Sequence, residues 1–332
     1  MKLIAEIAQA HDGSLGILHS YIDALAATGV DAIKFQTHIA QAESSIHEPF
    51  RVNFSYEDQT RYDYWERMEF TQQQWQGIAD HCEKVGLEFW SSPFSNAAVD
   101  LLESVGVYGY KVGSGEVSNF LLLEKIAQTG KPLIISSGMS SLQELDKTVA
   151  FLENKKVDFA ILQCYTAYPT SPSQYGLNVI GELKSRYPDK TIGFSDHSAG
   201  TVSNIAAVAL GAEILEFHAV WDKRMFGPDA QASLEIDEIK QLVDDVSKLT
   251  IALENPINKN DNSAFAKVKS IFEKSLAVNK SLKKGDVLTF DDLEAKKPKG
   301  YGIAASSFDK VIGKKLTVDK GAFEFLNEDD LL

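Results

Sequence analysis

The sequence has little cysteine and no long hydrophobic run. Cys82 and Cys164 are the only cysteines among 332 residues, and we interpret both as buried thiols in a reducing compartment rather than as a disulfide or metal ligands. No apolar run approaches the ~20 residues that a membrane span requires, and no charged and apolar leader precedes the first expected strand. We therefore expect a cytoplasmic protein that has no membrane partner.

Positive charge is also scarce. The chain has 33 Lys and Arg against 47 Asp and Glu, which gives a formal net charge of −14. This balance argues against nucleic acid or an anionic membrane surface as a partner. The apolar fraction of 44% supports a sizeable core. The length suits one barrel-sized domain followed by a remainder of about 60–80 residues.

Eight short apolar runs recur along the first 220 residues. Each has the length and the β-branched and aromatic content of a buried strand, and stretches with helical apolar spacing, such as Leu142–Asn154, lie between them. Eightfold strand–helix alternation predicts an α/β protein, a closed parallel (β/α)8 TIM barrel. The expected strands are Lys2–Ala8, Ala32–Gln36, Glu88–Ser92, Gly109–Gly115, Pro132–Gly138, Phe159–Tyr165, Thr191–His197 and Ile214–Val220.

The rest of the chain suggests further divisions. We expect the barrel over residues 1–254, a polar linker over 255–272 and a small β-rich domain over 273–332. Within the barrel, Thr37–Phe70 is long for a loop and rich in aromatic residues. We interpret it as a lid packed by its own aromatic side chains, with direct substrate contact by one or two rings as the alternative.

Two histidines stand near the carboxyl ends of the last two expected strands. Loops after the strands of a TIM barrel build the active site, so His197 and His218 are expected to lie close together, beside Asp196 and Asp229. Two imidazoles are few for a structural site, and they favour an exchangeable divalent cation with open positions. The alternative is a packing role for each histidine.

Two lysines also stand near strand ends. Lys34 and Lys111 need anionic partners if they are buried. Small hydroxyl residues and glycines follow them, in Gly113-Ser114-Gly115 and Ser136-Ser137-Gly138. Hydroxyls and exposed backbone N–H groups beside two ammonium groups predict a cradle for a phosphate or a carboxylate. The alternative is a pair of structural salt bridges with Glu6 and Glu116.

These segments resemble the sialic acid (nonulosonic acid) synthases, which condense phosphoenolpyruvate with an N-acetylated hexose. The tail, with Lys283-Lys284-Gly285-Asp286 and Pro298–Gly302, resembles the antifreeze-like SAF domain of that family. The barrel segments that carry the resemblance are Ala5-Glu6-Ile7, His11-Asp12-Gly13, Lys34-Phe35-Gln36, Lys111–Glu116, Ser136–Met139, Tyr168-Pro169, Ser195-Asp196-His197, Gly227-Pro228-Asp229 and Ala232–Glu235.

The resemblance implies roles for individual residues. It places phosphoenolpyruvate on Lys34, Lys111, Ser114, Ser136 and Ser195, and a manganese or magnesium ion on His197 and His218. It implies catalytic roles for Glu116, Glu6, His197 and His218, and sugar contacts for Gln36, Thr166, Tyr168, Asp229 and Lys297. Lys297 stands where the family has an arginine that reads the sugar from a neighbouring subunit, which implies a domain-swapped homodimer with an altered sugar preference.

The expected reaction joins phosphoenolpyruvate to an N-acylated amino- or deoxy-hexose, giving a 2-keto-3-deoxy acid and phosphate. One alternative is an N-acetylneuraminate synthase proper that uses N-acetylmannosamine, with Lys297 as a tolerated replacement. A second is a metal-dependent lyase that cleaves a keto acid by a retro-aldol reaction, and a third is a non-catalytic carbohydrate-binding protein.

Overall fold

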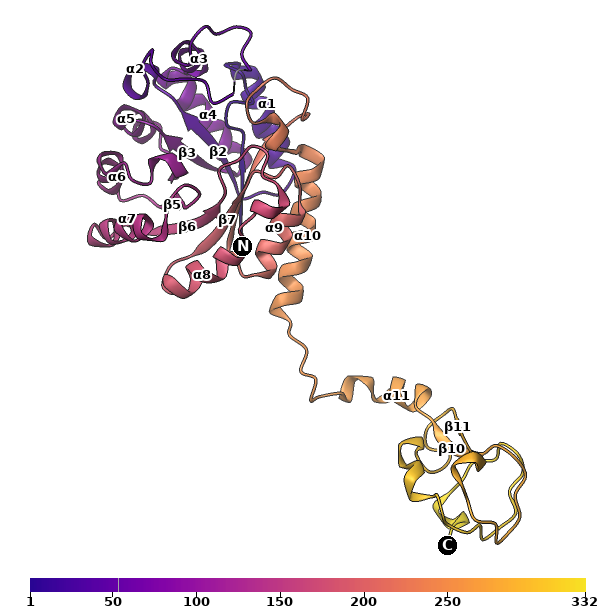
Figure 1. Cartoon of the computed structure of the whole chain (residues 1–332). Coiled ribbons are helices and arrows are strands. Elements are labelled where there is room, and N and C mark those ends of the chain that lie inside the picture. Colours follow the sequence, from indigo (N-terminus) through magenta and orange to yellow (C-terminus); the bar gives the residue numbers. More distant parts are fainter. Residues whose placement is uncertain (53) are drawn as a thin grey trace. The chain divides into compact units, whose positions relative to one another are not determined.

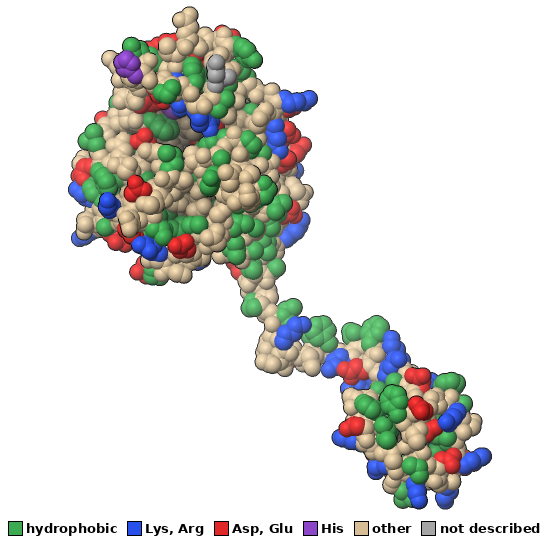
Figure 2. Space-filling model, in the orientation of Figure 1, with side chains coloured by type: hydrophobic (Ala, Val, Ile, Leu, Met, Phe, Trp, Pro, Cys, Tyr) green, Lys and Arg blue, Asp and Glu red, His purple; other side chains and the backbone are tan. Residues whose placement is uncertain are grey.

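The chain folds into two compact units, Met1–Asn255 and Pro256–Leu332. The computed structural model describes residues 1–52 and 54–332. Within these residues, no helix combines the length and apolarity needed to cross a membrane. Cys82 and Cys164 are both free and buried, as expected. On the face shown in Figure 2, acidic and basic side chains are interspersed.

The first unit is a closed parallel barrel, as predicted (Figure 1). Each strand pairs with the next, and the eighth pairs back with the first through Lys2↔Ile214 to Glu6↔His218. The fourth strand is shorter than expected, because Ser114–Glu116 forms a 3-10 turn. The strands are β1 (Lys2–Glu6), β2 (Ala32–Thr37), β3 (Glu88–Pro93), β4 (Gly109–Val112), β5 (Leu133–Ser136), β6 (Phe159–Cys164), β7 (Ile192–Asp196) and β8 (Ile214–Val220), with β9 (Leu234–Glu235) beside β8.

Helices surround the ring of strands (Figure 1). Several begin at a hydroxyl residue whose side chain accepts a backbone N–H of the first turn, for example Ser14, Thr71, Ser95 and Ser141. Such caps fix where each loop ends and its helix begins. The helices are α1 (Leu15–Ala26), α4 (Gln72–Val85), α5 (Asn96–Ser104), α6 (Phe120–Ala127), α7 (Leu142–Asn154), α8 (Asn178–Arg186), α9 (Val202–Ala209) and α10 (Ile236–Glu254).

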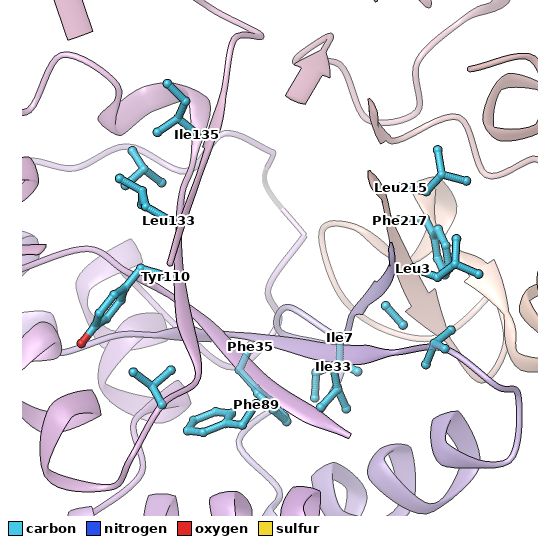
Figure 3. Close-up of a cluster of buried hydrophobic side chains, with 14 of the residues drawn as sticks. Leu3, Ile7, Ile33, Phe35, Phe89, Tyr110, Leu133, Ile135, Leu215 and Phe217 are labelled. Carbon is cyan, nitrogen blue, oxygen red and sulfur yellow. The ribbon is translucent and has the colours of Figure 1, made fainter. Parts of the chain in front are cut away.

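The strands present different side chains to their two faces. Side chains such as Ile33, Phe35, Leu133 and Phe217 form a core around the outside of the ring (Figure 3). Alternate residues belong to a second, smaller cluster, which lines the interior: Ile4, Ala32, Trp90, Ile134, Ala160, Leu162 and Ile214. The same alternation, continued toward the carboxyl ends, places polar residues above this apolar floor.

The segment between β2 and α4 contains two helices, α2 (Ala40–Glu43) and α3 (Arg61–Met68). Its own aromatic side chains pack together, as predicted, in a cluster of Ala40, Tyr64, Trp65 and Met68 with Phe50, Phe54 and Tyr62 against it. Arg67 anchors the segment, because its guanidinium contacts Asp12 at 2.6 Å and Asp58 at 2.8 Å. We call Thr37–Phe70 the lid.

The second unit has a small core of its own. Strand β10 (Ser275–Val278) pairs antiparallel with β11 (Leu293–Lys296), and α11 (Ala266–Phe272) precedes them within the expected linker. The remaining strand-like contacts are isolated bridges. The buried side chains are Leu276, Val278, Leu282, Leu288, Ile303, Val311, Leu316 and Leu326.

Closure of the barrel leaves no room for a side chain at Gly193 on β7. A Cβ there would contact Leu162 and lie 2.5 Å from the carbonyl oxygen of Ile214. We predict that Gly193→Ala lowers the free energy of unfolding by about 1–3 kcal/mol, as overpacking does. Gly181→Ala is the control, because it lies in α8 with no heavy atom within 4 Å of its added Cβ. Urea denaturation would measure both, and equal midpoints for the two variants would contradict this account.

Candidate active site

The carboxyl ends of the strands surround two adjoining cavities. The inner pocket, of about 190 Å³, lies among residues of the barrel strands and the loops that follow them. The outer pocket, of about 350 Å³, is lined largely by the lid. Residues that line both pockets are Gln36, Phe94, Thr166, Tyr168 and His218. A molecule in one pocket is therefore next to a molecule in the other.

Four buried charges form a network in the inner pocket. Lys34 Nζ lies 2.7 Å from Glu6 Oε1 and 3.7 Å from Glu216 Oε2, and Lys111 Nζ lies 2.5 Å from Glu216 Oε1. Ser195 Oγ also donates to Glu216, at 2.9 Å. All four residues are at most 3% exposed. The four charged residues come from four different strands of the barrel, β1, β2, β4 and β8.

The network keeps Lys34, Glu6 and Glu216 charged. Burial alone would lower the pKa of Lys34, but the carboxylates of Glu216 and Glu6 outweigh it and raise that pKa. Burial would raise the pKa of Glu6, yet Lys34, His218 and Lys111 hold it well below its usual range. Burial likewise opposes ionisation of Glu216, and Lys111 and Lys34 keep its pKa low. The ion pair of Lys34 with Glu6, which belongs to the alternative of structural salt bridges, is therefore present.

Glu116 does not pair with Lys111. Because Ser114–Glu116 turns away from β4, the Glu116 carboxylate accepts from Asn119 Nδ2 at 2.7 Å and lines the outer pocket. Lys111 finds Glu216 instead, 105 residues away in the sequence. The alternative of structural salt bridges therefore does not hold for Glu116, because Lys111 pairs with Glu216 and the carboxylate of Glu116 lies elsewhere in the site.

The two histidines lie side by side, with ring centroids 5.1 Å apart. His197 Nδ1 is 3.2 Å from the carbonyl oxygen of Tyr165, and since a carbonyl only accepts, Nδ1 carries the proton and Nε2 keeps a lone pair. Burial and the neighbouring His218 lower the pKa of His197 to about 3. His218 Nε2 lies 3.2 Å from Glu6 Oε2.

This donor set fits a divalent cation with few protein ligands. A neutral imidazole with a free nitrogen is a metal ligand, and His218 and the Glu6 carboxylate are its neighbours. Within the residues that the structure describes, no group of three or more His, Cys, Asp or Glu side chains is arranged to hold a metal ion. Asp196 does not take part, because its carboxylate accepts from Ser198 at 2.8 Å and Asn204 at 3.0 Å.

The lid reaches across the outer pocket through Arg51. Its guanidinium contacts Asp229 Oδ1 at 2.6 Å and lies 4.1 Å from the ring centroid of Tyr168. The Tyr168 ring in turn packs against His197, with centroids 4.2 Å apart, and burial raises the pKa of Tyr168. Arg51 therefore links the lid to the loops after β6 and β8.

His38, at the start of the lid, is held on every side. Its ring stacks between Trp65 and Phe94, with centroids 3.9 Å and 4.7 Å away. Its Nδ1 lies 2.6 Å from Glu43 Oε1, and its Nε2 lies 3.0 Å from Gln9 Nε2. The ring therefore fixes the lid against the amide of Gln9 at the pocket wall.

The structure gathers nearly all of the predicted site residues. Lys297 belongs to the second unit, where its Nζ lies 4.7 Å from the ring centroid of Phe272. The inner pocket includes Glu6, Lys34, Lys111, Ser114, Ser136, Ser195, His197 and His218, and the outer pocket includes Gln36, Glu116, Thr166, Tyr168 and Asp229.

Sequence reasoning missed Glu216, Ser92, His38 and Arg51. Glu216 had a usable signal, because it stands two residues before His218 on one strand and so faces the same side. Ser92 had the same kind of signal at the end of β3, where it accepts from Lys34 at 3.3 Å. Arg51 and His38 had none, because their positions depend on how the lid packs.

We predict that Glu216→Gln destabilises the protein by about 3–5 kcal/mol at neutral pH, because it leaves Lys111 buried without its counter-charge. The matched control is Glu213→Gln, whose side chain is 56% exposed beside Lys184 and should change stability little. Urea denaturation at several pH values would measure both variants.

The pH dependence gives a second check. The folded-state pKa of Glu216 is lowered, so its stabilisation is fully present above the unfolded pKa of about 4.3 and is lost as the pH falls toward the folded value. The gap between wild type and Glu216→Gln should therefore narrow below about pH 4. Equal stability of wild type and variant at pH 7 would contradict the assigned pairing.

Comparison with known proteins agrees with the fold and the resemblance. Residues 21–258 match the NeuB family, and residues 273–332 match the SAF domain. Human N-acetylneuraminate-9-phosphate synthase is 34% identical over 321 residues, which cover 95% of this chain and 88% of the human protein. The N,N'-diacetyllegionaminic acid synthase of Campylobacter jejuni is 32% identical over 332 residues, 98% of each chain.

A solved structure of a sialic acid synthetase also has a similar fold. The N-acetylneuraminic acid synthetase of Leptospira borgpetersenii, crystallised in complex with citrate, matches with a TM-score of 0.71 and 29% identity, over 80% of this chain and 90% of that one. The family match spans more than two thirds of the chain. The chain belongs to the NeuB family and carries a C-terminal SAF domain.

Proposed function

We propose that the protein is a phosphoenolpyruvate-dependent transferase that condenses phosphoenolpyruvate with an N-acylated amino- or deoxy-hexose. The products are a nonulosonic 2-keto-3-deoxy acid and phosphate. The observation that carries the proposal is the inner pocket, where two buried lysines and several serine hydroxyls lie beside two histidines. The names of the relatives describe synthases of such acids.

The lysines and serines are the proposed phosphoenolpyruvate site. The Lys111 ammonium group has three N–H donors, so its pair with Glu216 leaves donors for a ligand. The hydroxyls of Ser114 and Ser136 add neutral donors, and the Ser195 hydroxyl, which donates to Glu216, completes the proposed site. The pocket floor is tight as well, because a Cβ on Gly138 would lie 2.7 Å from Ser114 Oγ and 2.8 Å from Thr166 Oγ1.

His197 and His218 are the proposed ligands of a manganese or magnesium ion, with Glu6 beside them. Such an ion would act as a Lewis acid toward the open-chain aldehyde of the sugar. Glu6 accepts from Gln36 Nε2 at 2.8 Å, so the same carboxylate also orients a residue that lines both pockets.

The carbon–carbon bond forms when C3 of the enol attacks the aldehyde carbon. The aldehyde oxygen takes up a proton, and C2 becomes an oxocarbenium centre. Water then adds at C2 and gives its proton to a carboxylate, for which Glu116 is positioned at the pocket wall by Asn119. The resulting hydroxyl of the tetrahedral intermediate loses its proton as the C2–O bond to phosphate breaks, leaving the keto group.

The sugar is proposed to lie in the outer pocket, near Gln36, Thr166, Tyr168 and Asp229, with Lys297 supplied by the second unit of a partner chain.

A retro-aldol lyase that works through a lysine Schiff base needs an unprotonated amine. The raised pKa of Lys34 and the ion pair of Lys111 with Glu216 oppose this. The same network therefore favours anion binding over amine nucleophilicity.

We predict that two variants separate binding from turnover. His218→Ala should abolish phosphate release from phosphoenolpyruvate and N-acylated hexoses, while phosphoenolpyruvate affinity, measured by calorimetry, stays within about threefold. Lys111→Met should weaken that affinity at least tenfold, since charge-assisted hydrogen bonds contribute about 1.5–3 kcal/mol each. Wild type stripped with EDTA should be inactive and recover with manganese or magnesium.

Several results would contradict the proposal. Full activity after EDTA treatment would remove the metal from the mechanism. Unchanged phosphoenolpyruvate affinity in Lys111→Met would leave Lys111 as a structural partner of Glu216 only. The absence of phosphate release from wild type with every N-acylated hexose tried would oppose the condensation itself.

We also predict that the active site is completed in trans. His218→Ala disables the barrel and Lys297→Ala disables the second unit, so a mixture of the two chains should regain activity in hybrid dimers if Lys297 serves the partner's barrel. Subunit exchange would be verified with differently tagged chains. No recovery in verified hybrids of two folded, inactive parents would exclude this arrangement.

A further inference from the structure

The charges of the outer pocket are unlike those of the inner one. Two guanidiniums line it, and each is already paired with a carboxylate, Arg51 with Asp229 at 2.6 Å and Arg61 with Glu48 at 3.1 Å. Two further carboxylates, Glu43 and Glu116, also line it. Among the described lining residues, carboxylates therefore outnumber guanidiniums by four to two.

The walls of the outer pocket are mainly aromatic. The rings of Phe50, Phe54, Tyr64, Trp65, Phe94 and Tyr168 line it. Rings of this kind pack against the C–H faces of a sugar and the methyl of an acyl group. The neutral polar side chains Gln9, Gln36 and Thr166 remain to bind hydroxyl or amide groups.

The inner pocket, the proposed anion site, has a different balance of charges and hydroxyls. Its two lysines equal its two carboxylates, Glu6 and Glu216, in number. Three serines, Ser92, Ser114 and Ser136, add hydroxyl donors there, while the Ser195 hydroxyl donates to Glu216. The outer pocket has one aliphatic hydroxyl, on Thr166, and two phenolic hydroxyls, on Tyr64 and Tyr168, among its described lining residues. A phosphate in the outer pocket would also face the multiply charged anion proposed for the inner one.

We infer that the outer pocket selects an uncharged N-acylated amino sugar and discriminates against the same sugar bearing a phosphate ester. The inference rests on the proposed function and narrows its substrate class. Family membership does not decide whether the sugar carries a phosphate, because one relative is named for a phosphorylated product and another is not. Lys297, if a partner chain supplies it, adds one cation and leaves the carboxylates in excess.

The test compares one sugar with and without its phosphate. N-acetylmannosamine and N-acetylmannosamine 6-phosphate would each be titrated calorimetrically into the full wild-type chain with phosphoenolpyruvate bound, after EDTA treatment to prevent turnover. Wild-type turnover of both sugars would be followed by loss of phosphoenolpyruvate. We expect the neutral sugar to bind at least tenfold more tightly and to have the higher kcat/KM.

Two variants connect the preference to the ion pairs. Glu48→Gln frees Arg61, so it should reduce the preference for the neutral sugar at least threefold. Glu57→Gln is the matched control, since it makes the same change on an exposed part of the lid whose side chain does not line the pocket. This control should leave the preference unchanged.

The possible outcomes distinguish a failure of the charge selection from a failure of the proposed condensation. Equal or tighter binding of the phosphorylated sugar, or binding of neither, would overturn the inference. Turnover of the phosphorylated sugar at the higher kcat/KM would overturn it too, while leaving the proposed condensation intact. Turnover of neither, although the neutral sugar binds more tightly, would count against the condensation and leave the charge selection supported.

Discussion

The site depends on four charges buried inside the barrel. A buried ion is costly unless it is paired, and Lys34 and Lys111 pair with Glu6 and Glu216. Their strands are β2, β4, β1 and β8, so the pairing is complete only when the barrel has closed through the β1–β8 ladder. The polar layer that would do the chemistry thus forms together with the fold.

Glu6 joins the two halves of the inner pocket. One of its oxygens contacts Lys34 at 2.7 Å and the other contacts His218 Nε2 at 3.2 Å. On β8, Glu216 and His218 are two residues apart and face the same way, the first toward the lysines and the second toward His197. A change at Glu6 would therefore disturb both the proposed anion site and the proposed metal site.

The features that could be predicted from the sequence are those that local residue patterns determine. The strands, the strand-end residues and the aromatic packing of the lid follow from periodicity and from barrel geometry. The partner of Lys111 did not follow, because Glu216 is 105 residues away in the sequence and only the closed barrel brings the two side chains together. Arg51 was missed for the same reason, since its contacts with Asp229 and Tyr168 exist only after the lid has packed.

The His11-Asp12-Gly13 motif illustrates how a loop beside the active site can serve the lid. Asp12 and Gly13 have φ values of 46° and 75°, and a Cβ on Gly13 would lie 2.6 Å from the carbonyl oxygen of Arg67. Asp12 receives the Arg67 guanidinium, and the His11 ring packs on Phe70 with centroids 5.0 Å apart. None of the three residues lines either pocket. Their contacts hold α3 in place, and α3 carries the Tyr64 and Trp65 rings of the outer pocket, so this motif shapes the proposed sugar site without touching it.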